Sequence, residues 1–89
     1  FKGWTSYAAT LGEAKFVDCY FGYGNGYSYM RPYAPTVLKG CTFCAGYVLD
    51  ATRTTVTLEN CYVGDTLITT ENITSLLGGS AANAVVSNG

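Results

Sequence analysis

Cysteine is the residue type in this chain with the clearest chemical potential, because a thiolate can bind a metal ion or exchange disulfides. Cys41 and Cys44 have the C-x-x-C spacing of a redox or metal half-site. If both lie on one strand, however, alternation directs their side chains to opposite faces. The sequence has no second pair and no histidine to complete a zinc site. We therefore interpret Cys41 as a core residue and Cys44 as an outward one, and predict no metal and no cofactor.

The charged residues form no recognisable catalytic group. Asp18, Glu59 and Asp65 lack the spacing that would pair carboxylates for glycoside hydrolysis. The absence of histidine removes the commonest general base. Arg31 and Asp50 are expected to be outward neighbours, as a substrate-facing pair or, more commonly, as a surface salt bridge. The sequence names no catalytic residue and favours a non-catalytic protein over an enzyme.

Tyrosine is the most suggestive surface residue, with eight copies in 89 residues. Tyrosine rings stack on sugars and anchor protein contacts, although strands are also enriched in tyrosine for their own packing. Both explanations stay open. The candidate carbohydrate- or partner-binding residues are Tyr20, Tyr23, Tyr27, Tyr29, Tyr33 and Tyr62.

The overall charge limits the classes of partner. The net charge is −1 and the five Lys and Arg residues are scattered, so no basic patch is available to neutralise phosphates and nucleic-acid binding is not expected. No apolar run approaches the roughly 18 residues of a membrane helix. We expect residues 1–89 to be a single segment. The lack of an initiator methionine or signal peptide suggests a piece of a longer or self-assembling protein.

A repeated motif predicts the elements that position these residues. The segments FVDCYF (16–21), LKGCTF (38–43) and LENCYV (58–63) share an apolar residue, a turn-forming residue, a cysteine and a second apolar residue. Their cysteines lie 22 and then 20 residues apart, a period typical of repeat architectures. The first apolar residue and the cysteine can both face inward only if the chain bends between them. The bend falls at Asp18, Gly40 and Asn60, residue types that tolerate left-handed backbone.

Each unit therefore predicts a strand, a tight corner and a second strand. The side chains of Cys19, Cys41 and Cys61 would be inward free thiols that act as small apolar groups. Tyr20 and Tyr62 would point outward in one column. Residues 27–31, 47–51 and 66–69 are expected to form a further stack of strands. The interior residues of that stack would be Met30, Leu49 and Ile68.

The ends of the chain also match the repeat. Trp4 and Gly89 stand where the motif has its cysteine, which would leave open strand edges at both ends. Residues 70–78 predict a short helix, with Thr70 as N-cap and Gly78 as C-cap.

Short strands joined by corners and repeated every 20 to 22 residues predict an all-β fold. The specific prediction is a right-handed parallel β-helix, or solenoid, of about three to four coils with one short helix near the C-terminus. The cysteine units, with residues 31–33 and 48–51, resemble those of the right-handed parallel β-helix proteins of the pectin-lyase-like superfamily. The nearest likeness is to repeats of bacterial surface proteins, adhesins and phage tail proteins. It covers most of residues 16–69.

The resemblance implies a fold more than an activity, since such proteins include polysaccharide lyases, hydrolases and passengers without catalysis. The paired acidic calcium ligands and the basic catalytic residue of pectate lyases have no matching motif here.

These observations favour a non-catalytic β-helical scaffold or adhesin segment of an extracellular surface or virion protein. The alternatives are a fragment of a carbohydrate-active β-helix, either a polysaccharide lyase or a hydrolase, and a self-assembling filament module. The expected partners are a polysaccharide or host surface glycan, or further copies of the chain associated end to end or laterally. Membrane insertion is not expected, and the expected location is extracellular, at the cell surface or on a virion.

Overall fold

Short strands dominate the computed structural model, which describes residues 4–7, 14–22 and 28–89, and the side chains of the last two ranges. The elements in chain order are β1 (Trp4–Tyr7), β2 (Ala14–Val17), β3 (Tyr20–Phe21), β4 (Tyr29–Pro32), β5 (Thr36–Lys39), β6 (Thr42–Phe43), β7 (Val48–Leu49), β8 (Val56–Glu59), β9 (Tyr62–Val63), β10 (Thr66–Leu67), α1 (Ile73–Leu76) and β11 (Ala84–Val86).

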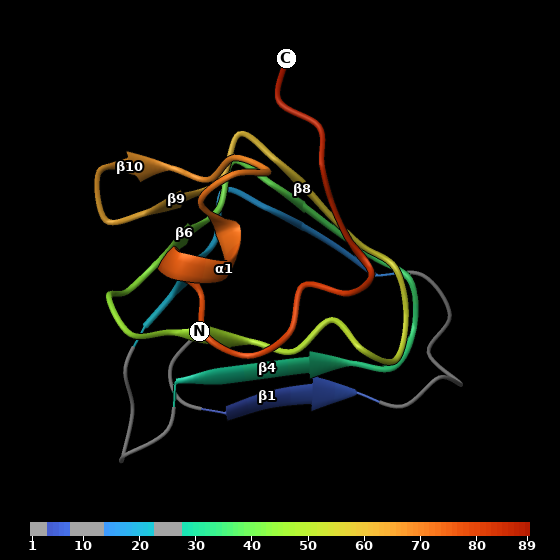
Figure 1. Ribbon diagram of the computed structural model, residues 1–89. Helices are drawn as coiled ribbons and strands as arrows, with labels where there is room; N and C mark the ends of the chain where they lie inside the picture. The colour runs from blue at the N-terminus through green and yellow to red at the C-terminus, as the bar shows by residue number, and fades with distance from the viewer. Residues whose placement is uncertain (1–3, 8–13, 23–27) are drawn as a thin grey trace.

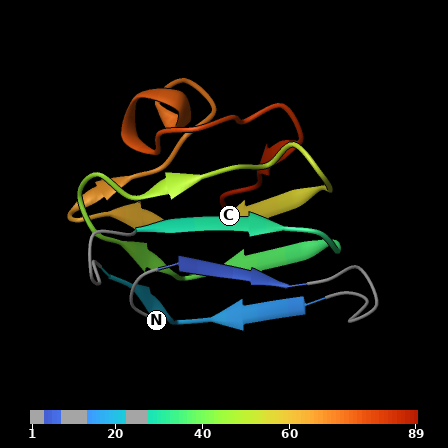
Figure 2. The same ribbon diagram turned by 90° about the horizontal axis from the view of Figure 1, so that it is seen from below.

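These strands form three sheets around a common interior (Figure 1). The strand orders are β1-β4-β7, β10-β9-β6-β3 and β11-β8-β5-β2. Every pair in these sheets is parallel except β10 with β9. Figure 2 shows the levels lying one above another, with the blue strands β1 and β2 at one end and α1 at the other.

The register aligns the repeated motifs residue by residue. Phe16 pairs with Leu38 and Leu38 with Leu58, while Phe21 pairs with Phe43 and Phe43 with Val63. Side chains alternate between the two faces of a strand, so these aligned apolar positions all fall on the inner face. All of them are buried except Phe16, which is half-buried. The predicted motif alignment is therefore confirmed.

The bend before each repeated cysteine is also confirmed. Asp18, Gly40 and Asn60 have φ values of 55°, 65° and 54°. The Asp18 amide donates to the Lys39 carbonyl at 2.9 Å, and the Gly40 amide donates to the Glu59 carbonyl at 2.8 Å. Each corner is thus hydrogen-bonded to the next, which fixes the direction in which the following strand leaves.

Aromatic rings fill the interior beside the corners. The Phe21 and Phe43 rings are stacked, with centroids 5.1 Å apart and an angle of 17° between their planes. The buried Tyr47 ring lies 5.0 Å from Phe43 and 6.0 Å from Phe21. Such ring pairs add about 0.5–1.5 kcal/mol to the area they bury, so this cluster is a main source of cohesion between neighbouring repeats.

The predicted fold class, a right-handed parallel β-helix of about three to four coils, is wrong. The structure is a small compact globule with mostly short strands in parallel and mixed sheets. Its radius of gyration is 11.5 Å, close to the roughly 12 Å expected of a compact domain of this length. The regular succession of parallel strands is interrupted after β9, where the chain reverses and β10 runs antiparallel to β9, and only β11 later pairs in parallel, with β8.

The predicted strand at 66–69 is present in part, as β10, but its predicted place beside residues 47–51 is wrong. Gly64 has a φ of 59° and lies in a two-residue turn that returns Thr66 and Leu67 to β9, away from β7. The place beside β7 is taken by residues 78–80 instead. The Leu49 amide donates to the Gly78 carbonyl at 3.1 Å, and the Ala51 amide to the Ser80 carbonyl at 2.8 Å. Ile68 is buried, but its amide donates to the Cys61 carbonyl and not to the β7 strand.

The two ends of the chain differ in how well they match the prediction. Trp4 pairs with Tyr29 in the β1-β4-β7 sheet, so it does not occupy a cysteine corner. Val86 pairs with Leu58 as the motif predicts. The expected helix is present but short, and it begins after Asn72 where Thr70 was the predicted N-cap. The Asn72 side chain accepts from the Thr69 amide at 2.7 Å, which closes the preceding turn.

Candidate functional site

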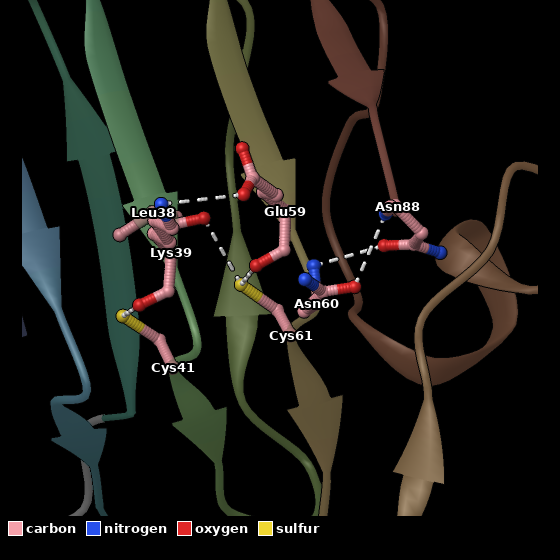
Figure 3. Close-up of polar contacts among 8 residues, drawn as sticks. Leu38, Lys39, Cys41, Glu59, Asn60, Cys61 and Asn88 are labelled. Atoms are coloured by element: carbon pink, nitrogen blue, oxygen red, sulfur yellow. Dashed lines mark hydrogen bonds and ion pairs between the residues drawn. The ribbon is translucent and has the colours of Figure 1, made fainter.

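The corner cysteines Cys19, Cys41 and Cys61 are the first candidate site, and Figure 3 shows the surroundings of Cys41 and Cys61. All four cysteines are free thiols. The Cys61 thiol donates to the Leu38 carbonyl at 3.2 Å, and the Cys41 thiol lies 3.5 Å from the Phe16 carbonyl. Both thiols are buried. A hydrogen bond with the Cys61 thiol, together with burial, raises the pKa of Cys41.

This environment keeps the Cys41 sulfur protonated at neutral pH, and a thiol is a far weaker nucleophile and metal ligand than a thiolate. Cys44, the second member of the C-x-x-C pair, is half-buried. Within residues 14–22 and 28–89, no cluster of three His, Cys, Asp or Glu side chains is arranged to hold a metal ion. The hydrogen bond with Cys41 lowers the pKa of Cys61 to about 7, so the packing role of both residues rests on the burial of their sulfur atoms and on their contacts with backbone carbonyls.

Polar side chains continue the corner ladder outside the cysteines. Lys39 and Glu59 form an ion pair of 3.6 Å on the outer surface (Figure 3). Asn88 Oδ1 accepts from the Asn60 amide at 2.9 Å, and Asn60 Oδ1 accepts from the Gly89 amide at 3.4 Å. These contacts hold the C-terminal segment at the corner of the preceding repeat, which is a structural role.

The second candidate site is the tyrosine column, formed by Tyr20, Thr42 and Tyr62. The register places Tyr20 beside Thr42 and Thr42 beside Tyr62 on strands β3, β6 and β9. Tyr20 is 56% exposed and Tyr62 is 39% exposed. The predicted outward orientation of both rings is therefore confirmed, and their place in one column follows from the register.

The third candidate site is the arginine–tyrosine cluster, formed by Arg31, Tyr33 and Arg53. The guanidinium carbon of Arg31 lies 5.2 Å from the centre of the Tyr33 ring, and that of Arg53 lies 5.4 Å from it. Arg31 and Tyr33 are half-buried, whereas Arg53 is exposed. Two positive charges therefore share one aromatic ring.

A carboxylate beside this cluster is occupied by other partners. Asp50 accepts from the Tyr29 hydroxyl at 3.0 Å and from the Thr52 hydroxyl at 2.6 Å. The hydrogen bonds from Thr52 and Tyr29 lower the pKa of Asp50 despite some desolvation. Burial and the bond to Asp50 raise the pKa of Tyr29. The predicted salt bridge between Arg31 and Asp50 does not form among the described contacts, although the Arg31 charge contributes to the lowered Asp50 pKa.

The structure thus separates the predicted tyrosines. Tyr20 and Tyr62 share the tyrosine column, whereas Tyr29 and Tyr33 lie at or just after β4, near Asp50 and the two arginines. The predicted site residues Tyr23 and Tyr27 lie outside the described residues.

Sequence reasoning missed Arg53 and Thr52. The signal for Thr52 was the Asp-x-Thr spacing, because an Asp side chain commonly accepts from the backbone two residues on. Here the Thr52 amide lies 3.2 Å from Asp50 Oδ1. That turn leads directly to Arg53, but no pattern in the sequence pairs Arg53 with Tyr33.

No helix in the part of the chain that the structure describes is long and apolar enough to cross a membrane. Comparisons of this chain with protein-family models, with curated proteins and with solved structures found no match.

Proposed function

We propose that this chain is a non-catalytic scaffold segment of an extracellular surface or virion protein, and that its tyrosine column binds carbohydrate. The observation that carries the proposal is the in-register placement of Tyr20, Thr42 and Tyr62 with both rings exposed. The alternative explanation is that tyrosine is frequent in strands for packing reasons. It accounts for the residue type but does not account for the exposure of two rings in one column.

The spacing of the column suits an extended sugar chain. Neighbouring strands lie about 4.8 Å apart, so Tyr20 and Tyr62 are separated by roughly 10 Å at the backbone. This separation is about the length of a disaccharide. Thr42 lies between the rings and supplies a hydroxyl that can donate or accept a hydrogen bond.

The rigidity of the strands favours binding. Tyrosine has few rotatable bonds, and its backbone here is held by a parallel neighbour on at least one side. Little conformational freedom is then lost when a sugar stacks on the ring, so a weak stacking contact contributes more of its energy to affinity.

A glycan array of neutral and acidic oligosaccharides tests the proposal. The wild-type chain is expected to bind at least one glycan, and Tyr20→Ser and Tyr62→Ser are each expected to reduce that signal about tenfold or more. Val85→Ser is the matched control, because Val85 is 48% exposed but lies on β11, in a different sheet. Binding to no glycan, or turnover of an acidic polysaccharide by the chain, would contradict the proposal.

Self-association is a second candidate function, favoured by the arrangement of sheet edges. Among the strands that the structure describes, β1, β2 and β3 each stand at the end of their sheet, at one end of the molecule (Figure 2). Val17 on β2 is 49% exposed. An exposed apolar side chain on a terminal strand favours contact with a second copy of the chain. Sedimentation velocity at increasing concentration tests this function, and a sedimentation coefficient that stays monomeric throughout would rule it out.

A further inference from the structure

The arginine–tyrosine cluster holds two positive charges that form no ion pair among the described residues, although the Asp50 carboxylate is close enough to interact electrostatically with Arg31. A cation over an exposed aromatic ring gains only about 0.5–1 kcal/mol, and two guanidinium groups near one ring repel each other. An ion pair with an acidic residue would offset that repulsion. Among the residues that the structure describes, the one ion pair is between Lys39 and Glu59, so neither Arg31 nor Arg53 has an acidic partner there.

The nearby carboxylate does not supply that partner. Both Asp50 oxygens accept hydrogen bonds from Tyr29 and Thr52. Asp50 is held in this orientation by the Thr52 backbone amide as well. Asp50, which the sequence predicts as the neighbour of Arg31, therefore accepts hydrogen bonds from Tyr29 and from its own turn and forms no salt bridge with Arg31 among the described residues.

Arg31 also has an unused donor inside the cluster. Its Nε atom is buried and has no hydrogen-bond partner among the residues that the structure describes. Leaving a buried donor unsatisfied costs about 1–3 kcal/mol, so an acceptor that reaches this atom would recover part of that cost. The guanidinium fork presents Nε–H beside a terminal N–H, the geometry that binds two oxygens of one anion.

We propose that the arginine–tyrosine cluster is a binding site for a tetrahedral oxyanion, a sulfate or phosphate group. Arg31 donates through Nε–H and a neighbouring N–H, Arg53 adds the second positive charge, and the Tyr33 ring holds both guanidinium groups in place. Arg31 lies on β4, and Tyr33 and Arg53 lie outside the strands, so this site is separate from the tyrosine column on β3, β6 and β9 and does not depend on it. The anion would come either from a sulfated or phosphorylated saccharide or from the free ion.

Nitrogen–proton correlation spectra of the arginine side chains test the proposal directly. The ¹⁵N-labelled chain is titrated in parallel with sodium sulfate, sodium phosphate, glucose 6-sulfate and unmodified glucose. The two inorganic ions are expected to shift the Arg31 Nε–H signal saturably, with a dissociation constant of about 1 mM or tighter. Tighter binding of glucose 6-sulfate than of sulfate would assign the anion to a saccharide, and equal binding would assign it to the free ion. An equal response to unmodified glucose, or no saturable shift with any anion, would overturn the proposal.

Four substitutions distinguish a defined anion-binding site from non-specific attraction by nearby positive charge. Arg31→Gln and Arg53→Gln are each expected to weaken sulfate binding about tenfold. Lys39→Gln makes the same change in net charge on another sheet and is expected to leave sulfate affinity unchanged. Arg31→Lys keeps the charge but removes the Nε–H and the planar fork, so it should bind as weakly as Arg31→Gln. Wild-type affinity in Arg31→Lys, with a folded circular dichroism spectrum, would refute the site.

Discussion

Replacing Gly79 with alanine tests how residues 78–80 complete the sheet beside β7. Gly79 has a φ of 89°, and an alanine Cβ there would lie 2.7 Å from the Leu49 carbonyl oxygen. Because that oxygen belongs to the backbone, it cannot move aside without disturbing β7. Gly46 is the matched control, since its φ is 82° and a Cβ there would meet nothing within 4 Å.

The expected magnitude follows from two contributions. A side chain in left-handed backbone costs about 1–2 kcal/mol, offset by about 0.4–1 kcal/mol from the less flexible unfolded chain, so both variants should lose about 1 kcal/mol. Only Gly79→Ala should also break the bonds from the Leu49 and Ala51 amides to residues 78–80. At about 1 kcal/mol for each bond, that variant should lose about 3 kcal/mol in total.

Urea denaturation of the two variants measures these free energies of unfolding, and amide hydrogen exchange locates the effect. The amides of Leu49 and Ala51 should exchange faster in Gly79→Ala than in Gly46→Ala, relative to wild type. Equal losses of stability in both variants, with unchanged exchange at these two amides, would refute the placement of residues 78–80 beside β7.

Three further predictions concern side chains. Hydrogen bonds from Thr52 lower the pKa of Asp50 below its unfolded value of about 3.9, so its charge stabilises the fold above that pH and the contribution is lost as the pH falls through the folded pKa. Asp50→Asn should therefore destabilise the chain in urea at pH 7, and the difference from wild type should shrink steadily as the pH is lowered below about 4. A difference that does not change with pH would contradict this. Iodoacetamide should label Cys44 before Cys41 in the folded chain, because Cys41 is buried with a raised pKa, and mass spectrometry showing equal rates would argue against the buried corner. Asn88→Ala should cost about 1 kcal/mol in thermal or urea unfolding, since it removes a side-chain bond to the preceding corner, and an unchanged stability would exclude that role.

The corners could be predicted from the sequence because residue type and backbone requirement coincide there. Asp18, Gly40 and Asn60 are types that accept positive φ, and each stands between two apolar residues that must both face inward. The register of the neighbouring strands then follows, since a slip by one residue would turn every apolar side chain outward.

The positions of the segments between β9 and β11 could not be predicted from the repeated corners. They depend on turns that are not part of the repeat. Gly64-Asp65 is a two-residue hairpin signal, and it returns the chain antiparallel to β9 where the repeat predicts continuation. The glycines at 78 and 79 then permit a close backbone approach to β7 that no hydrophobic pattern encodes. The period of the repeat alone does not indicate whether the chain after β9 continues as a further parallel strand or reverses in a hairpin.

One of the two candidate binding sites could be predicted from the sequence and the other could not. The tyrosine column could be predicted because Tyr20 and Tyr62 occupy the same position in two copies of the motif. The arginine–tyrosine cluster could not, because Arg53 lies in a turn whose direction is set by the Asp50 side chain. A contact between loop residues of this kind depends on tertiary geometry and leaves no periodic trace in the sequence.

The most direct test of the central claim is a backbone amide chemical-shift titration with the oligosaccharide that gives the strongest signal on the glycan array. The account predicts saturable shifts centred on Tyr20, Thr42 and Tyr62, with β11 unaffected. Shifts centred on any other surface, or none at saturating oligosaccharide, would contradict the assignment of carbohydrate binding to the tyrosine column.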